Sequence, residues 1–227
     1  MDTKTGKSRQ ELRSEETRNR IREAAGNLFT SKGYDSVTMR EIAKEAGCSH
    51  TTIYLYYKDK EALLEQLALP PLLSLEEAMR AVTERTELPP MEALKEISRQ
   101  FLLFCLSHKS MVTVIISVKS VRVDEADPES EVNKHRNQVF RYLADALNRV
   151  IEADAEEEKT NYTRIFFYML HGMVTTYIGN EEEIEPLYAR LVPILDQGIE
   201  IVVFGIEKKR KQDAKQGKKP KDKTGRK

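Results

Sequence analysis

The sequence predicts an all-α protein with a short N-terminal domain, which contains a helix-turn-helix, and a larger C-terminal helical domain. Apolar residues recur along most of the 227-residue chain with a period of about 3.6 residues, which is that of an α-helix. Near the N-terminus, Gly47 separates two short helical patterns, as expected of a residue that tolerates a left-handed turn. Farther on, the adjacent Pro70 and Pro71 mark the expected boundary between the two domains.

The first helix is expected to begin at Ser14, after a polar and unpatterned segment, residues 1–13, that we expect to be flexible. Lys32 and Gly33 end this helix. The N-terminal domain is predicted over residues 14–69. One face of its first helix is apolar and should face the core: Ile21, Ala24, Ala25, Leu28 and Phe29.

The helix-turn-helix is predicted over residues 38–57. Thr38 can cap its first helix, with Glu41 three residues on to complete a capping box, and Ser49 begins the second helix after the turn. Outside the apolar Ile53 and Tyr57, the side chains of the second helix are polar or aromatic, and none is acidic: His50, Thr51, Thr52, Tyr54 and Tyr56. That chemistry suits a surface that meets phosphates and base edges.

A fourth helix should begin at Asp59 and either end near Leu69 or resume as a kinked segment from Leu72 to about Thr86. Helices are also expected over residues 90–108, 128–150, 162–177 and 184–206, within a second domain of residues 70–206. The segment Met111–Val118 is rich in β-branched residues. We expect it to be helical nevertheless, because the sequence offers no partner strand.

The last two predicted helices carry apolar residues on more than one face, and each apolar face must be covered. We expect these helices to form a dimer interface, built as a four-helix bundle with a second copy. The alternative is that they complete the core of a monomer. The residues predicted for the interface are Phe166, Leu170, Val174, Leu191, Leu195 and Val202.

The net charge of zero conceals a strong partition of charge along the chain. The net charge is about +3 over residues 1–60, about −11 over residues 61–206 and about +8 over residues 207–227. The basic N-terminal part suits a polyanionic partner. The lysine-rich segment 207–227 is expected to be a disordered tail.

Several classes of protein are disfavoured by the sequence. It has neither an apolar run long enough to span a membrane nor a secretory signal, so we expect no membrane partner and a cytoplasmic location. Cys48 and Cys105 lack the spacing of metal ligands, and no metal or cofactor is expected. No nucleophile motif, phosphate-binding glycine loop or metal-binding helix points to an enzyme.

Residues of about 15–69 resemble the N-terminal domain of the TetR family of transcriptional regulators. The resemblance rests on the stretch TRNRIREAAGNLFTSKGYDSVTMREIAKEAGCSHTTIYLYYKDKEALL. It implies a three-helix DNA-binding domain followed by a helical ligand-binding and dimerisation domain. The expected function is that of a ligand-responsive homodimeric repressor on a palindromic double-stranded DNA operator. The alternative is a DNA-binding scaffold or regulator controlled by a protein partner.

The resemblance also implies roles for individual residues. Those matching phosphate or backbone contacts are Thr38, Arg40, Ser49, Thr51, Tyr56 and Lys60, and those nearest base edges and sugars are His50, Thr52 and Tyr54. Tyr57 matches a core position at which the family usually has phenylalanine, so its hydroxyl needs a partner. The effector, a small and largely apolar molecule of unknown identity, would be enclosed by helices between Leu63 and Val150. The candidate pocket residues are Phe101, Phe104, Cys105, His108, Met111, Tyr168 and His171.

Overall fold

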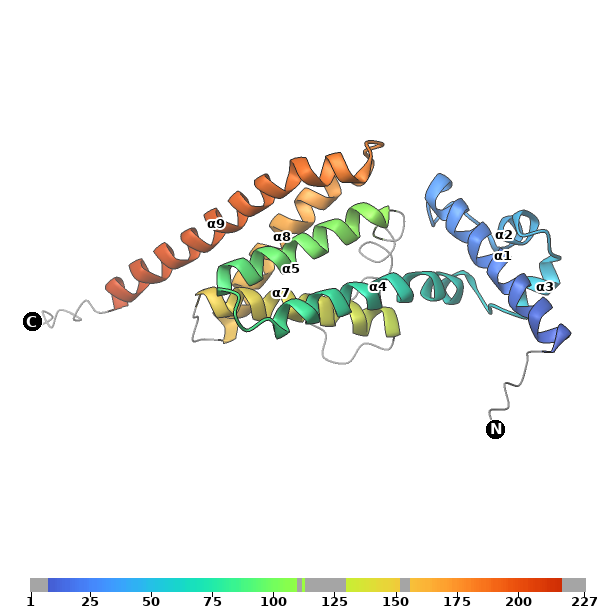
Figure 1. Cartoon of the computed structure of the whole chain (residues 1–227), viewed down its shortest axis with the longest axis horizontal. Helices are drawn as coiled ribbons and strands as arrows, with labels where there is room; N and C mark the ends of the chain where they lie inside the picture. Colours follow the sequence, from blue (N-terminus) through green and yellow to red (C-terminus); the bar gives the residue numbers. More distant parts are fainter. Residues whose placement is uncertain (1–7, 110–111, 113–129, 152–155, 218–227) are drawn as a thin grey trace, which may run out of the picture. The chain divides into compact units, whose positions relative to one another are not determined.

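The computed structural model describes residues 8–109, 112, 130–151 and 156–217. These residues form eight α-helices and no strand (Figure 1), which confirms the all-α prediction for the described part of the chain. The predicted helix over Met111–Val118 lies, apart from Val112, outside the described residues. The helices are α1 (Arg9–Lys32), α2 (Met39–Glu45), α3 (His50–Tyr54), α4 (Lys60–Glu84), α5 (Pro90–Ser107), α7 (Glu131–Ile151), α8 (Glu156–Tyr177) and α9 (Ile184–Gly217).

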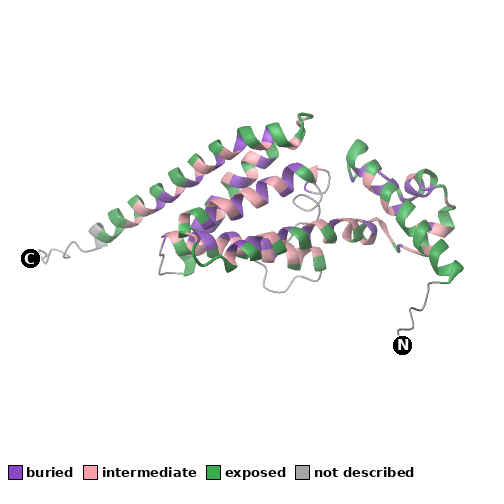
Figure 2. Cartoon of the chain, in the orientation of Figure 1, coloured by how far each residue is buried: buried purple, intermediate pink, exposed green. Residues whose placement is uncertain are grey.

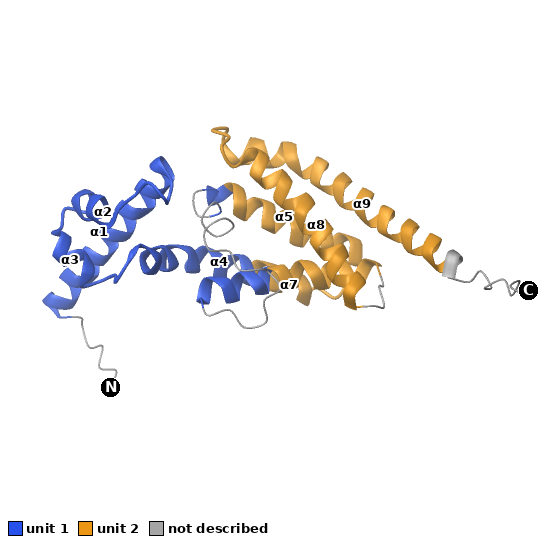
Figure 3. Ribbon diagram, turned by 180° about the vertical axis from the view of Figure 1, so that it is seen from behind, with its two compact units in different colours: residues 1–77, 107–139 blue, residues 78–106, 140–227 orange. Residues whose placement is uncertain are grey.

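The chain divides into two compact units (Figure 3). The first combines residues 1–77 with residues 107–139, and the second combines residues 78–106 with residues 140–227. The first unit contains α1, α2 and α3, and the second contains α8 and α9. Helices α4 and α7 contribute residues to both units, and α5 belongs to the second unit except for its last residue, Ser107.

Helix α1 begins at Arg9, so the predicted start at Ser14 is wrong and residues 9–13 are helical. The cause is a capping box that the sequence reading missed. The Glu11 backbone N–H donates to Ser8 Oγ at 3.2 Å, and the Ser8 backbone N–H donates to Glu11 Oε2 at 2.6 Å. The predicted core stripe is confirmed in full, because its five members are the buried residues of α1: Ile21, Ala24, Ala25, Leu28 and Phe29.

Helix α4 continues through Pro70 and Pro71, where the sequence predicted an end or an interruption. The two prolines remove backbone donors from the helix interior. The Ser74 hydroxyl donates to the Pro70 carbonyl oxygen at 3.1 Å and provides that acceptor with another donor. Buried residues continue at helical spacing on both sides of the prolines, so packing maintains the helix where local propensity opposes it: Leu63, Ala68, Leu72, Leu75, Met79 and Val82.

Helix α9 extends to Gly217, so the prediction of a disordered tail from residue 207 is wrong for residues 207–217. Two pairs at helical spacing support the extension, Lys209 with Asp213 at 2.9 Å and Lys211 with Glu207 at 3.9 Å. The Arg210 guanidinium also donates to the backbone carbonyl of Ile151, at the end of α7. Helix α8 begins at Glu156, six residues before the predicted start at residue 162, because the acidic side chains of its first turn stabilise the positive end of a helix.

Most residues predicted for the dimer interface lie in the interior of the second unit instead. Their side chains are at most 2% exposed within a single chain: Phe166, Leu170, Val174, Leu191 and Leu195. Val202 is half-buried. The prediction of these five as interface residues is therefore wrong, because their side chains are already buried within a single chain. Figure 2 shows the resulting alternation of buried and exposed residues along both helices.

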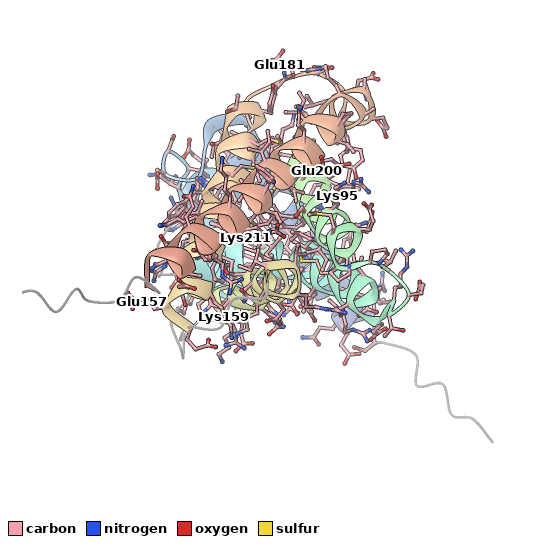
Figure 4. All side chains as sticks on the ribbon, turned by 90° about the vertical axis from the view of Figure 1, so that its left-hand side faces the viewer. Lys95, Glu157, Lys159, Glu181, Glu200 and Lys211 are labelled. Atoms are coloured by element: carbon pink, nitrogen blue, oxygen red, sulfur yellow. The ribbon has the colours of Figure 1, made fainter. Side chains whose placement is uncertain are left out.

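Two polar contacts join α5 to α9 within the second unit. The Arg99 guanidinium donates to both carboxylate oxygens of Asp196. Lys95 Nζ lies 2.7 Å from Glu200 Oε1, and both residues are labelled in Figure 4. The carboxylates raise the pKa of Arg99 and of Lys95, so both side chains stay cationic.

Candidate nucleic-acid interface

The start of α2 is fixed by its capping residue, Thr38. The Glu41 backbone N–H donates to Thr38 Oγ1 at 3.3 Å, and the Thr38 backbone N–H donates to Glu41 Oε2 at 2.9 Å. The bond from the Thr38 backbone lowers the pKa of the Glu41 carboxyl group most, and bonds from the Thr38 hydroxyl at 2.9 Å and from Lys32 Nζ at 3.2 Å lower it further. The predicted capping box is present, and Arg40 is exposed one residue into the helix.

The turn between α2 and α3 depends on the left-handed conformation of Gly47, whose φ is 64°. The backbone N–H of Cys48 reaches back to the Ala43 carbonyl at 2.9 Å, and that of Gly47 to the Lys44 carbonyl at 3.2 Å. The pair of bonds closes the end of α2. A side chain at position 47 would strain the backbone whatever the surrounding space.

Helix α3 is capped by Ser49, whose Oγ accepts from the Thr52 backbone N–H at 2.9 Å. Of the side chains predicted to contact DNA, those of Ser49, His50, Thr51 and Tyr54 are exposed. The rings of His50 and Tyr54 meet edge to face with their centroids 5.1 Å apart. The exposed surface of α3 therefore presents hydroxyl, imidazole and phenol groups on a rigid short helix.

The remaining residues of this region differ in burial. Thr52 and Tyr56 are half-buried, whereas Tyr57 is buried, as predicted for a core position. The Tyr57 hydroxyl has no hydrogen-bond partner among the described residues. Burial raises the pKa of Tyr57, against the opposing effect of the nearby Arg22 and Arg18 guanidiniums.

Lys60, predicted to contact a phosphate, is folded back onto its own domain. Its ammonium group donates to the backbone carbonyls of Tyr34 at 2.7 Å and Val37 at 3.0 Å. It also lies 4.1 Å from the centroid of the Tyr34 ring. In this conformation Lys60 binds the loop before α2.

Three residues beside α3 were missed by the sequence reasoning. The Arg18 guanidinium lies 5.8 Å from the centroid of the Tyr56 ring, and an Arg20 nitrogen approaches Gly47. Both arginines are exposed on α1, and nothing in their spacing along the first helix pointed to the turn. Leu55, which directly follows α3, is 79% exposed. An exposed leucine there suits apolar contact with a thymine methyl group.

A cavity of about 220 Å³ lies within the second unit, inside the chain segment predicted to enclose an effector. It is formed by the end of α4, the first half of α5 and the second half of α7. Its lining combines apolar residues with the phenol of Tyr142, the carboxyl group of Asp145 and the guanidinium of Arg149. The other lining residues are Thr83, Pro90, Ala93, Ile97 and Ala146.

None of the predicted pocket residues that the structure describes lines this cavity. Phe101, Phe104 and Cys105 are buried core residues, and burial raises the pKa of the Cys105 thiol. Tyr168 is 65% exposed, so it lies on the surface of α8. Burial lowers the pKa of His108.

His171 stacks on Phe167, with ring centroids 6.0 Å apart, and Phe101 contacts the same phenylalanine at 6.1 Å. The structure thus brings these two predicted residues to one aromatic cluster. Met111, the remaining predicted pocket residue, lies outside the described residues.

The described residues form neither a candidate metal site nor a helix suited to cross a membrane. Within residues 8–109, 112, 130–151 and 156–217, no three His, Cys, Asp or Glu side chains are placed to hold a metal ion. None of the helices in that part of the chain combines the length and the apolar character needed to cross a bilayer.

An all-helical chain whose N-terminal unit presents a capped, acid-free recognition helix belongs to the class of helix-turn-helix DNA-binding regulators. Comparison with known families agrees. Residues 21–67 match the model described as bacterial regulatory proteins of the tetR family, and residues 94–193 match the tetracyclin repressor-like C-terminal domain. The chain belongs to the TetR family of transcriptional regulators, whose members are regulators and not enzymes.

Similar proteins extend over most of the chain. The fatty acid metabolism regulator protein of Bacillus subtilis is 24% identical over 192 residues, which cover 83% of this chain and 95% of that protein. A TetR-family regulator from Bordetella parapertussis superimposes with a TM-score of 0.60 at 25% identity, covering 78% of this chain and 93% of the other. The fatty acid degradation regulator FadR of Bacillus halodurans has the same fold, with a TM-score of 0.57 at 20% identity, covering 81% and 94%.

Proposed function

We propose that the protein is a repressor that binds a palindromic DNA operator as a homodimer in the cytoplasm and is released by a small, largely apolar effector. The observation that carries the proposal is the exposed surface of α3. It is polar and aromatic, contains no acidic side chain, and is held by the Ser49 cap and the Gly47 turn. Such a surface can exchange hydrogen bonds with base edges without repelling phosphates.

The homodimer is supported by large apolar side chains that remain exposed on α8 and α9. Ile201 and Phe204 of α9 are 64% and 67% exposed, and Ile165, Tyr168 and Ile194 are also exposed. Ile194 and Ile201 are seven residues apart, which places them on one face of α9. An exposed apolar surface on two packed helices suits a four-helix bundle with a second copy of the chain.

The cavity of the second unit supports a small effector. Its volume of about 220 Å³ is below the roughly 300–1,000 Å³ of sites for drug-sized ligands. Among the lining residues, the apolar Ala93, Ile97 and Ala146 suit a hydrocarbon group, and the guanidinium of Arg149 suits an acidic head group. The similar protein of Bacillus subtilis is a fatty acid metabolism regulator, which supports the same chemistry, a fatty acid or its derivative.

The DNA-binding role is tested by placing a carboxylate on the exposed surface of α3. We expect Thr51→Glu to abolish binding to a duplex selected by the wild-type protein from a randomised DNA library, because a carboxylate on this surface repels the phosphate oxygens of DNA. Fluorescence anisotropy measures the binding. Thr86→Glu, which adds the same charge at an exposed position of the second unit, is the control and should bind as wild type. Equal binding by both variants would contradict the proposal.

The effector is tested with dodecanoic acid as the probe. We expect the probe to release the DNA duplex, and Arg149→Ala to raise the concentration required, because the guanidinium supplies the contact to the carboxylate. Arg85→Ala removes an exposed arginine away from the lining and is the matched control. If the Arg149 substitution leaves release by the probe unchanged, the effector binds at another site.

A further inference from the structure

Lys60 begins α4 beside the N-terminal end of the helix-turn-helix. The preceding residue, Asp59, caps α4 by accepting from the Ala62 backbone N–H at 2.7 Å. The Lys60 side chain then spans from this capped turn to the loop between α1 and α2. Its ammonium lies 2.7, 3.0 and 3.5 Å from the carbonyl oxygens of Tyr34, Val37 and Asp35, respectively.

The hydrogen-bonding capacity of Lys60 is already used within the protein. A lysine ammonium has three donor hydrogens and no acceptor, and three carbonyl oxygens stand around this one. The bonds to Tyr34 and Val37 are partly buried. A phosphate that captured the ammonium would leave these two carbonyls short of a donor, which is unfavourable for buried acceptors.

The Tyr34 ring completes the site. Its face lies 4.1 Å from Lys60 Nζ, a distance at which the ring attracts a cation. The ring also packs against Phe29 of α1, with centroids 5.2 Å apart. The Tyr34 hydroxyl is buried without a partner among the described residues, and burial raises the pKa of Tyr34 to about 12. The phenol therefore stays neutral, and its contribution to the site is the ring face.

We propose that Lys60 is a positioning residue that ties the first turn of α4 to the loop leading into α2, and is not a phosphate contact. Val37, one of its acceptors, directly precedes the Thr38 cap of α2. These hydrogen bonds fix the position of the start of α2 relative to α4. They therefore also fix the positions of the Gly47 turn and α3. The inference rests on the DNA-binding function proposed above for its functional consequence, but the tie itself is a property of the free protein.

The two roles predict different results for Lys60→Met, which keeps the aliphatic stem and removes the donors. If Lys60 is a positioning residue, its loss should speed hydrogen exchange over residues 34–38 and lower the thermal unfolding midpoint by at least about 2 °C. Affinity for the selected duplex should fall about tenfold, with the slope of log K against log salt unchanged. Loss of a phosphate contact would instead reduce that slope by about 1 per contact and leave hydrogen exchange and the midpoint unchanged.

Lys60→Arg provides a second variant that retains the positive charge. A guanidinium group binds phosphate well. However, its planar arrangement of donors does not match the three carbonyl oxygens that surround the Lys60 ammonium group. We expect Lys60→Arg to show faster exchange over residues 34–38 and weaker DNA binding than wild type. Wild-type behaviour of this variant in both measurements would overturn the inference. If the wild-type protein selects no duplex, the proposed function fails, whereas hydrogen exchange without DNA still decides the role of Lys60.

Discussion

The helix-turn-helix and the α8–α9 pair differ in how their exposed residues are specified. In the helix-turn-helix, most side chains expected at the surface are exposed, although Thr52 and Tyr56 are half-buried. Local signals fix this geometry, because Thr38 and Ser49 cap the two helices and Gly47 makes the turn. In α8 and α9, five residues expected at an interface are core residues, whereas Ile201 and Phe204 are exposed. Neighbouring residues in the sequence thus specify where these short helices begin and end. They do not specify which of two apolar faces of a helix is buried in the core.

The largest effect is expected from a truncation inside the α8–α9 core. Leu191→Ala should lower the free energy of unfolding by about 2–5 kcal/mol, because it removes a fully buried side chain and leaves a cavity. Urea denaturation measures the change. Leu73→Ala, which truncates an exposed leucine of α4 outside the proposed dimer surface, is the matched control and should change stability by less than about 0.5 kcal/mol. Equal losses in both variants would contradict the burial of Leu191.

The exposed face of α9 is tested by combining Ile201→Glu with Phe204→Glu. We expect the double variant to be monomeric and to bind the selected duplex at least about 30-fold more weakly, which corresponds to a hot spot of about 2 kcal/mol. Light scattering and DNA binding measure the two effects. Leu73→Glu, which changes an exposed leucine of α4, should leave the dimer intact. A dimer that survives the double substitution would place the interface elsewhere.

The arginines of α1 sharpen the description of the recognition region. Arg18→Ala and Arg20→Ala should each lower the slope of log K against log salt by about 1 per lost phosphate contact, with base preference unchanged. The reason is that both side chains are exposed beside the helix-turn-helix, Arg18 against the Tyr56 ring and Arg20 near the Gly47 turn. Binding titrations at several salt concentrations provide the slope. Unaltered slopes would restrict the contact surface to the helix-turn-helix.

The smallest effect is expected at Tyr57. Tyr57→Phe should raise the free energy of unfolding by about 1 kcal/mol, because it removes a buried hydroxyl that has no partner among the described residues. Tyr54→Phe, which removes an exposed hydroxyl, is the control and should leave stability unchanged. A loss of stability in Tyr57→Phe would show that the hydroxyl is hydrogen-bonded after all.

Most of the helical architecture could be predicted from the sequence, and the errors have local physical causes. The start of α1 was placed late because the Ser8–Glu11 capping box lies outside the apolar stripe. The end of α9 was placed early because its last turns are rich in lysine, yet ion pairs and the contact of Arg210 with Ile151 maintain the helix. The continuity of α4 through Pro70 depends on buried residues on either side.

Four features could be predicted from the sequence alone: the all-α class, the limits of the helix-turn-helix, the α1 core stripe and the polar character of the α3 surface. These features depend on side-chain type and on neighbours a few residues away, so a linear pattern contains them. Other features could be seen only in the tertiary structure. They are the buried face of α8 and α9, the cavity lined by Arg149, the contact of Arg18 with Tyr56 and the hydrogen bonds of Lys60 to the loop before α2. Each of these depends on contacts between residues distant in the chain, and a periodic pattern does not specify which partners meet.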